Sequence, residues 1–280
     1  MRVRVFAVVV VLVAVFAGAA EAAPRYTALG DSYAAGPLIP LPLPPYGCLK
    51  SSNNYAHLAQ ARLAYAEFAD PTCSGAETDD MTQPQNVSPG PNPPQLNSLS
   101  ADTALVTLEI GGNDIGFSSI AEDCFSPTPY GSPCRDMYVR DGQDEISRRI
   151  AETAPKVDAV LDGIRARSPQ ARILVVNYSA IFPHTGDGCY PQMPVARGDV
   201  PYLRAKQEEL NAMLADQAAA NGAGLVDVYA ASRGHDACAP PGVRWVEPYV
   251  PVNAAAPLHP NLFGMQAMAD LVVTAAAPSG

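Results

Sequence analysis

Four short motifs, spread along the chain, carry residue types that together could do chemistry at a carbonyl group. Gly-Asp-Ser at 30–32 supplies a serine hydroxyl, which becomes a nucleophile once a base takes its proton. His259, in PLHPNLFG, is a candidate for that base. Asn113, in GGND, and the backbone N–H of Gly75, in CSGA, could donate hydrogen bonds to an oxyanion. This set predicts acyl transfer from an ester through Ser32.

Each motif alone also has a plain structural interpretation. Gly-Gly-Asn-Asp has the composition of a turn, and a lone histidine is more often structural than catalytic. Ser32 departs from the nucleophile elbow Gly-x-Ser-x-Gly, because Ala34 stands where the second glycine belongs. His259 is the favoured histidine, since a loop that enters the final helix can reach the end of the first strand. The other histidines are His57, His184 and His235.

The elements that must position these residues are predicted from the hydrophobic pattern. Short apolar runs that fit buried strands span residues 26–29, 104–110, 173–178 and 225–228, with a weaker one at 66–69. Apolar residues at helical spacing predict helices near residues 55–63, 146–164, 203–218 and 262–275. Strands that alternate with helices predict a parallel sheet covered on both faces. We therefore expect one three-layer α/β/α domain.

The motifs follow predicted strands directly. Ser32 comes just after the first strand, Asn113 after the strand at 104–110, and Gly75 after the weak strand. In a parallel α/β sheet, ligands bind outside the carboxyl ends of the strands. The positions of the three residues therefore favour a functional site at this edge.

Two proline-rich stretches, residues 37–47 and 83–96, are predicted to be loops. The first follows Ser32 and carries four apolar residues, Leu38, Ile39, Leu41 and Leu43. It is either an apolar wall beside the site or a stiff surface connection.

Residues 1–22 have the features of a secretory signal peptide. Arg2 and Arg4 precede an apolar run over residues 5–17, and Ala20-Glu21-Ala22 has the small residues that a signal peptidase recognises. The run is shorter than the roughly 20 apolar residues of a membrane-spanning helix. We therefore expect a secreted protein without stable membrane insertion, with residues 23–280 as its mature domain.

The net charge limits the possible binding partners, and the cysteine content indicates an oxidising environment. A net charge of −10 disfavours nucleic acid and anionic lipid as partners. Six cysteines in an exported chain predict three disulfides, and no Cys-x-x-Cys pair or His/Cys cluster suggests a metal site. Many pairings are possible. Pairing of neighbours along the chain closes compact local loops: Cys48 with Cys73, Cys124 with Cys134, and Cys189 with Cys238.

Taken in order, Gly-Asp-Ser, a glycine, Gly-x-Asn-Asp and a histidine near the C-terminus resemble the SGNH (GDSL) hydrolase family. The resemblance runs from ALGDSYAAG through CSGA and IGGND to HPNLFG, over most of residues 23–280. It implies a flavodoxin-like sheet, Ser32 as nucleophile and His259 as base. It also implies an oxyanion hole formed by the N–H groups of Ser32 and Gly75 and the side chain of Asn113. The cysteine layout is similar to that of secreted lipases and esterases of the family, which supports the sequential pairing.

The chain departs from the family pattern at one place. The family usually carries aspartate three residues before its histidine, where this chain has Ala256. Some group must still accept the Nδ1–H of His259, so that Nε2 faces Ser32. The backbone carbonyl of Ala256 is the simplest candidate, as in similar secreted members with a serine–histidine dyad. The alternatives are the side chains of Asp227, Asp236 and Asp270.

We therefore predict a secreted carboxylic-ester hydrolase, an esterase or lipase, that acts on a small-molecule or lipid ester. We expect it to be a monomer that uses no cofactor and no metal. The apolar loop at 37–47 favours acyl lipids over carbohydrate O-acetyl esters, which are the alternative substrate class. The alternative from another class is a secreted binding protein that keeps the fold without turnover. Reaction of Ser32 with a fluorophosphonate would separate these two classes.

Overall fold

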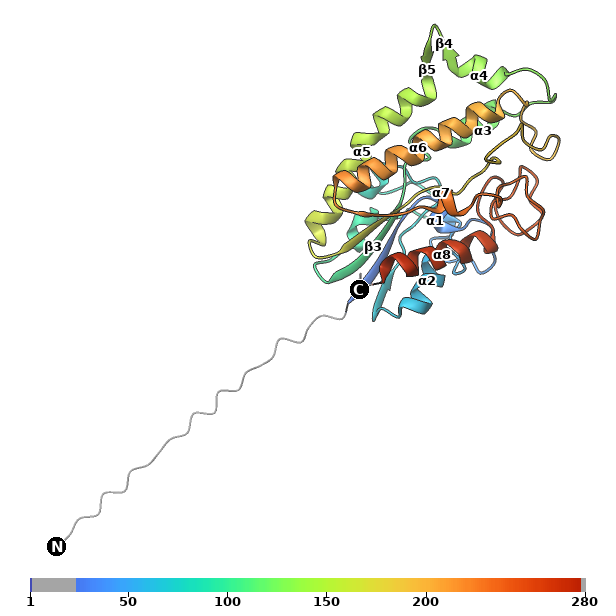
Figure 1. Ribbon diagram of the computed structural model, residues 1–280. Coiled ribbons are helices and arrows are strands. Elements are labelled where there is room, and N and C mark those ends of the chain that lie inside the picture. Colours follow the sequence, from blue (N-terminus) through green and yellow to red (C-terminus); the bar gives the residue numbers. More distant parts are fainter. Residues whose placement is uncertain (2–23, 278–280) are drawn as a thin grey trace.

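A five-stranded parallel sheet forms the centre of the protein in the computed structural model, which describes Met1 and residues 24–277 (Figure 1). Its strands are β1 (Arg25–Gly30), β2 (Glu67–Ala69), β3 (Thr103–Glu109), β6 (Arg172–Val176) and β7 (Gly224–Val226). The spatial order is β2-β1-β3-β6-β7, which is the flavodoxin-like order. All five predicted strands are confirmed. The predicted signal peptide, residues 1–22, lies outside the described residues apart from Met1.

Helices cover both faces of this sheet. The helices α5 (Glu145–Arg167) and α6 (Val200–Ala220) pack together on one face, and α2 (Tyr55–Leu63) and α8 (Leu262–Ala276) on the other (Figure 1). Each pair buries its own apolar core against the sheet. The predicted α/β/α class and single domain are thus confirmed. Within residues 24–277, the structure has no helix both long and apolar enough to cross a membrane.

The central strands β1 and β3 end in register, with Gly30 opposite Glu109. The chain after each strand therefore leaves the sheet at the same edge. The Asp31 N–H donates to the Glu109 carbonyl at 3.0 Å, which holds the two exits together. A Cβ on Gly30 would lie 2.6 Å from that carbonyl oxygen, so only glycine fits between the strands here. This close approach places Ser32 next to the loop that carries Asn113.

Several short elements were not predicted. They are the helices α1 (Ser32–Ala35), α3 (Phe117–Asp123), α4 (Pro133–Tyr138) and α7 (Val228–Ala231), three 3₁₀ turns at 46–48, 78–81 and 95–98, and a hairpin of β4 (Val139–Arg140) and β5 (Gln143–Asp144). Elements of one or two turns are too short to show a hydrophobic period. Two of these helices, α1 and α3, nevertheless carry residues of the site.

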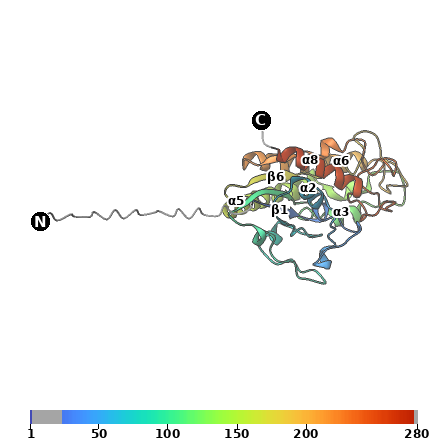
Figure 2. The same ribbon diagram turned by 90° about the horizontal axis from the view of Figure 1, so that it is seen from below.

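The proline-rich segments 37–47 and 83–96 are largely irregular loops, as predicted, with short 3₁₀ turns at their ends. They lie against each other, because the Gly47 N–H donates to the Pro89 carbonyl at 3.0 Å. Figure 2 shows loops from this part of the chain projecting on the side away from α8.

The three disulfides have the predicted pairing: Cys48–Cys73, Cys124–Cys134 and Cys189–Cys238. The first joins the loop after α1 to the turn that carries Gly75. This turn is also fixed to the sheet, since the Cys73 N–H donates to the Gly30 carbonyl at 3.1 Å. The disulfide therefore helps to hold Gly75 at the same edge as Ser32.

Candidate active site

Ser32 is the first residue of α1, a single helical turn that begins directly after β1. Asp31 caps this turn, because its carboxylate accepts the Tyr33 N–H at 2.9 Å. The N–H of the first helical residue has no acceptor within the helix. Ser32 is only 8% exposed and lines a pocket. Its hydroxyl therefore stands at the carboxyl edge of the sheet, with a free backbone donor beside it.

His259 meets Ser32 across 227 residues of sequence. Its Nε2 lies 2.8 Å from Ser32 Oγ, and its Nδ1 lies 2.7 Å from the carbonyl oxygen of Pro257. A carbonyl can only accept a hydrogen bond, so this contact places the ring proton on Nδ1. Nε2 is then unprotonated and can accept the proton of the Ser32 hydroxyl.

The prediction that the Ala256 carbonyl orients the ring was wrong. That carbonyl accepts the backbone N–H of His259 at 3.2 Å and so closes the turn before the histidine. The carbonyl of Pro257, one residue later, is left to meet the ring. A backbone carbonyl does replace the missing carboxylate, but it comes from a neighbouring residue.

The three aspartates considered as alternatives have other partners. Asp227 caps α7 and accepts a hydrogen bond from Asn177. Asp236 accepts the Cys238 N–H, and Asp270 pairs with Arg62 at the surface. None of the three therefore orients His259.

The imidazole of His259 packs against two aromatic rings. The ring centroid of Tyr33 lies 5.0 Å from that of His259, and the centroid of Phe117 lies 6.0 Å away. Burial lowers the pKa of His259 from its usual value, and the Pro257 hydrogen bond offsets this only in part. Burial therefore favours the neutral form of the ring.

Tyr33 holds the backbone of the histidine loop, a role that the sequence analysis missed. Its hydroxyl donates to the Leu258 carbonyl at 2.6 Å. Leu258 has φ +60°, a left-handed conformation that leucine rarely adopts, so the loop needs such support. Tyr33, the residue after Ser32, is thus bonded to Leu258, the residue before His259.

Glu247 is a second residue that positions this loop and was missed. Its backbone N–H donates to the His259 carbonyl at 3.0 Å, and its carbonyl accepts the Leu258 N–H at 3.0 Å. Its buried carboxylate accepts from Asn261 Nδ2 at 2.6 Å. Burial alone would raise the pKa of Glu247, but hydrogen bonds from Asn253 and Asn261 hold it below its usual value. A charged carboxylate, buried beside the loop that carries His259, therefore helps to fix that loop.

A buried chain of hydrogen bonds fixes the Gly112–Asn113 loop relative to Ser32. The Gly112 N–H donates to the Tyr178 hydroxyl at 2.7 Å, and that hydroxyl donates to Asp31 at 2.5 Å. Burial raises the pKa of Asp31 to about 7, against the lowering effect of its hydrogen bonds from Tyr178 and Tyr33. Because Asp31 also caps α1, one carboxyl group connects both loops of the site.

The two other predicted oxyanion donors lie at the same edge. Asn113 lines the pocket together with Ser32, and one N–H of its side chain donates to the Ala76 carbonyl at 2.9 Å. The second N–H of that amide remains available. Gly75 precedes Ala76 in a turn where its φ is +79°, a conformation that favours glycine. Within residues 24–277, the Gly75 N–H donates to no backbone or side-chain acceptor.

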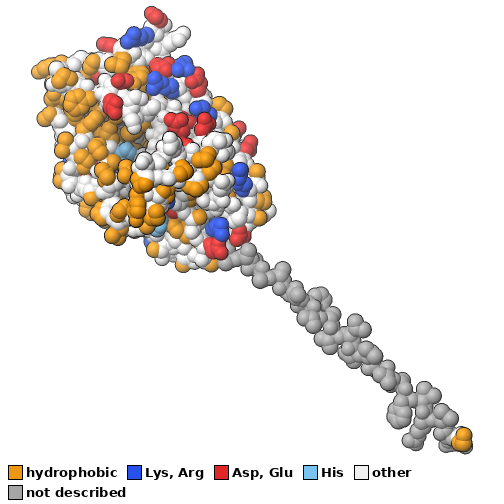
Figure 3. All heavy atoms as spheres, turned by 180° about the vertical axis from the view of Figure 1, so that it is seen from behind, with side chains coloured by type: hydrophobic (Ala, Val, Ile, Leu, Met, Phe, Trp, Pro, Cys, Tyr) orange, Lys and Arg blue, Asp and Glu red, His pale blue; other side chains and the backbone are white. Residues whose placement is uncertain are grey.

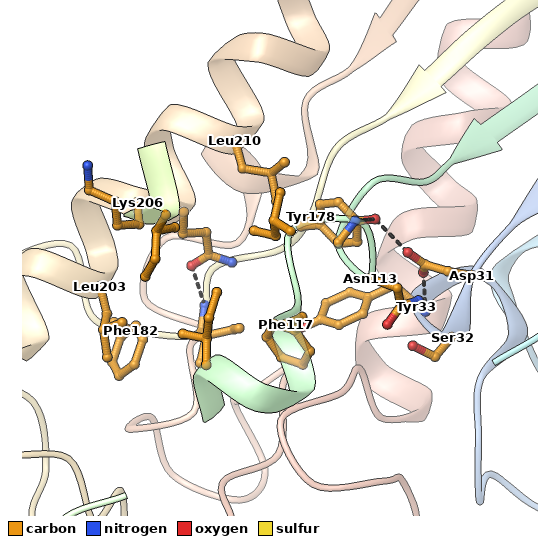
Figure 4. Close-up of a pocket in the computed structure, with 16 residues that line it drawn as sticks. Asp31, Ser32, Tyr33, Asn113, Phe117, Tyr178, Phe182, Leu203, Lys206 and Leu210 are labelled. Carbon is orange, nitrogen blue, oxygen red and sulfur yellow. Dashed lines mark hydrogen bonds between the residues drawn. The ribbon is translucent and has the colours of Figure 1, made fainter. Parts of the chain in front are cut away.

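An apolar pocket begins at Ser32 and Asn113 and extends between α3 and α6 (Figure 4). Its walls are formed by Ile115, Phe117, Ile120, Ile146, Ile181, Phe182, Leu203 and Leu210. The loop at 37–47 is not part of this lining, so the apolar wall comes from α3, α5 and α6 and from the segment after β6.

The polar side chains at the far end of the pocket already have partners. Lys206 lines the pocket with its stem, while its amino group pairs with Glu209 at 2.7 Å and Asp144 at 2.9 Å and points away (Figure 4). Gln207 accepts the Ile181 N–H at 3.0 Å. The far end therefore presents an apolar surface, which suits a hydrocarbon chain.

Comparison with known proteins identifies relatives over most of the chain. The GDSL-like Lipase/Acylhydrolase family model matches residues 28–267. Lipase 2 from Streptomyces coelicolor is 42% identical over 264 residues, which are 91% of this chain and 87% of that protein. Lipase 1 from the same organism is 29% identical over 245 residues, which are 87% and 83% of the two chains.

Two solved structures share the fold over nearly the whole chain. Phospholipase A1 from Streptomyces albidoflavus NA297 has a TM-score of 0.75 and 25% identity, and the match covers 92% of this chain and 100% of that one. The extracellular lipase from Streptomyces rimosus has a TM-score of 0.74 and 27% identity, with 91% and 100% covered.

Proposed function

Because the chain belongs to the GDSL-like lipase/acylhydrolase family and is a carboxylic-ester hydrolase of the lipase and esterase type, we propose that Ser32 is its nucleophile and His259 its general base. The observation that supports this assignment most is the distance of 2.8 Å between His259 Nε2 and Ser32 Oγ. The Pro257 carbonyl on Nδ1 adds to it, since it selects the tautomer that can take the serine proton.

The reaction has two half-reactions that use the same groups. Ser32 Oγ attacks the ester carbonyl carbon, and its proton moves to His259 Nε2. The oxyanion accepts hydrogen bonds from the Ser32 N–H, the Gly75 N–H and Asn113 Nδ2. The C–O bond to the alcohol then breaks, and His259 protonates the leaving oxygen. Water attacks the acyl-Ser32 ester by the same route and releases the acid.

We propose acyl lipids as the substrate class, with the acyl chain in the pocket between α3 and α6. The apolar walls and the internally paired Lys206 and Gln207 support this choice. Burial of a methylene group stabilises a complex by about 0.8 kcal/mol, which is about fourfold in kcat/KM. A sugar O-acetyl ester would leave this pocket mostly unused.

Longer acyl chains should therefore be better substrates than acetyl. Across p-nitrophenyl esters, we expect kcat/KM to rise about fourfold per methylene until the pocket is filled. Leu203→Trp narrows the far end (Figure 4), so it should lower kcat/KM for long chains at least about tenfold and leave the acetyl ester unchanged. Equal rates for all chain lengths, or a preference for acetylated xylan, would contradict the acyl-lipid assignment.

The acid limb of the pH profile should lie below the usual histidine range. The base acts only when neutral, and burial lowers the pKa of His259 from 6.5, so activity should persist to lower pH. Phe117→Ala lets water reach the ring and should move the midpoint of kcat/KM up towards 6.5. Phe125→Ala is the matched control, because Phe125 packs on Tyr249 instead. A midpoint that Phe117→Ala leaves in place would refute burial as the cause.

We further propose that the protein is secreted and acts as a monomer without a nucleic-acid partner. The signal-peptide pattern at residues 1–22, the three disulfides and the similarity to an extracellular lipase support secretion. The net charge of −10 is unfavourable for binding to nucleic acid.

A further inference from the structure

Six exposed apolar side chains come from the chain segments next to Ser32 and His259, and we refer to them as the apolar rim. Two follow α1, two stand in the loop before His259, and two begin α8 directly after it. They are between 39% and 77% exposed: Leu38, Leu41, Val250, Val252, Leu262 and Phe263. None of them lines the pocket beside Ser32. Their exposure therefore needs a reason other than contact with the acyl chain.

The two loops that carry four of the six rim residues meet in space. The Ala256 N–H donates to the Pro37 carbonyl at 3.0 Å, which joins the loop after α1 to the loop before His259. The loop that follows Ser32 and the loop that leads to His259 therefore lie side by side. Figure 3 shows a face on which hydrophobic side chains gather with few charged ones among them, while Lys, Arg, Asp and Glu gather elsewhere.

Two of the three rim leucines, Leu38 and Leu41, have a backbone conformation that is unfavourable for leucine. Leu38 and Leu41 have φ of +63° and +69°, in the left-handed region that favours glycine and asparagine and costs leucine free energy. Between them, Ile39 is buried and anchors the loop in the core of α2 and α8. In the other loop, the Glu247 carboxylate accepts the Val252 N–H at 2.8 Å. Both loops are therefore fixed by contacts with the rest of the protein, although these side chains remain exposed.

The absence of charged residues around the rim limits the kinds of partner surface that it can bind. Residues 32–49 and 248–269 contain no Asp, Glu, Lys or Arg, although the chain as a whole carries −10. A charge-free apolar rim offers nothing to an ionic partner, and the acidic remainder of the protein would be repelled by an anionic surface. Two rim residues follow α1, whose first residue, Ser32, lines a pocket that suits a hydrocarbon chain. These features fit the surface of a neutral or zwitterionic lipid aggregate.

We propose that the apolar rim docks the enzyme on such a lipid surface, so that an acyl chain passes from the lipid into the pocket beside Ser32. The proposal rests on the proposed acyl-lipid function. It adds the side of the protein from which the substrate enters the pocket. The rim side chains enter the lipid, while the charged remainder of the surface stays in water.

The test is binding to phosphatidylcholine vesicles, measured by co-sedimentation in a Ser32→Ala background that leaves the lipid intact. Leu38→Asn with Leu41→Asn should weaken partitioning roughly tenfold or more, because two leucines no longer leave water. Asparagine tolerates the left-handed backbone at both positions, so the fold is kept. Val250→Ser with Val252→Ser should act in the same way from the other loop. Met137→Gln on α4, at 42% exposed, is the matched control and should change nothing.

Three results would overturn the proposal. The rim variants could bind vesicles as well as the parent, or the parent could prefer phosphatidylglycerol vesicles to phosphatidylcholine. Sedimentation could also show a dimer that the rim variants dissociate, without vesicle binding, which would assign the rim to a second copy of the chain.

A separate measurement distinguishes failure of docking from failure of the catalytic assignment. With Ser32 restored, the rim variants should hydrolyse a monomeric short-chain ester with kcat/KM within about twofold of wild type, since the pocket is untouched. They should lose activity only on phosphatidylcholine vesicles. Loss on both substrates would place the rim in the catalytic machinery and refute the docking role. The binding assay itself does not depend on turnover.

Discussion

Ser32→Ala should lower kcat by about 10³ to 10⁶ and leave the fold intact. The hydroxyl oxygen is the only atom proposed to form the acyl-enzyme, and no other group at the site can replace it. Among residues 24–277, the Ser32 hydroxyl makes one hydrogen bond, to His259 Nε2 at 2.8 Å, so its removal disturbs no other hydrogen bond. Hydrolysis of p-nitrophenyl butyrate, together with the melting temperature, measures both effects.

A matched serine separates loss of the nucleophile from a general effect of the substitution. Ser179 is buried, and its Oγ has no hydrogen-bond partner among the described residues, so Ser179→Ala should keep wild-type kcat. If Ser32→Ala kept a tenth of the activity while folded, Ser32 would not be the nucleophile.

Asn113→Ala should lower kcat by about 10² to 10³, a smaller loss, because attack and proton transfer remain possible. One N–H of the Asn113 amide is used by the Ala76 carbonyl, and the other is the proposed donor to the oxyanion. A donor that acts on the oxyanion lowers the transition state more than the bound ester. We therefore expect the loss in kcat, with KM nearly unchanged.

The control for this substitution removes a similar hydrogen bond elsewhere. Asn92 Nδ2 donates to the Pro71 carbonyl at 3.1 Å, and Asn92 does not line the pocket beside Ser32. Asn92→Ala should cost stability without a specific loss in kcat. If both variants lost stability alike and kept kcat alike, Asn113 would be only a turn residue.

The fold and the position of Ser32 could be predicted because both depend on local patterns. Buried parallel strands appear as continuous apolar runs, and the ends of such strands share one edge. The order of Gly-Asp-Ser, Gly-x-Asn-Asp and the late histidine then placed Ser32, Asn113 and His259 at that edge. In the structure His259 Nε2 and Ser32 Oγ are within hydrogen-bond distance of each other.

The hydrogen-bond partner of His259 Nδ1 could not be predicted correctly from the sequence. Ala256 and Pro257 both offer carbonyls, and the choice depends on the backbone angles of one turn. The left-handed Leu258 sets these angles, and a leucine gives no sign of a positive φ. The partner is the Pro257 carbonyl only because the turn uses that of Ala256 for the backbone N–H of His259.

The residues that hold the site were missed for a different reason. Tyr33 supports Leu258 across 225 residues of sequence, and Tyr178 reaches Asp31 across 147. Such contacts depend on tertiary packing and leave no periodic pattern along the chain. The same holds for α3, whose Phe117 packs on His259 although the helix has only seven residues.

The most direct test of the account is the site of reaction with a fluorophosphonate. The phosphorus of this probe is attacked by an activated serine oxygen, fluoride leaves, and a stable phosphonyl ester remains. We predict one adduct per chain, on the peptide that contains Ser32, formed with loss of esterase activity and absent in Ser32→Ala. An adduct on another serine, or full inactivation with Ser32 unmodified, would contradict the central claim.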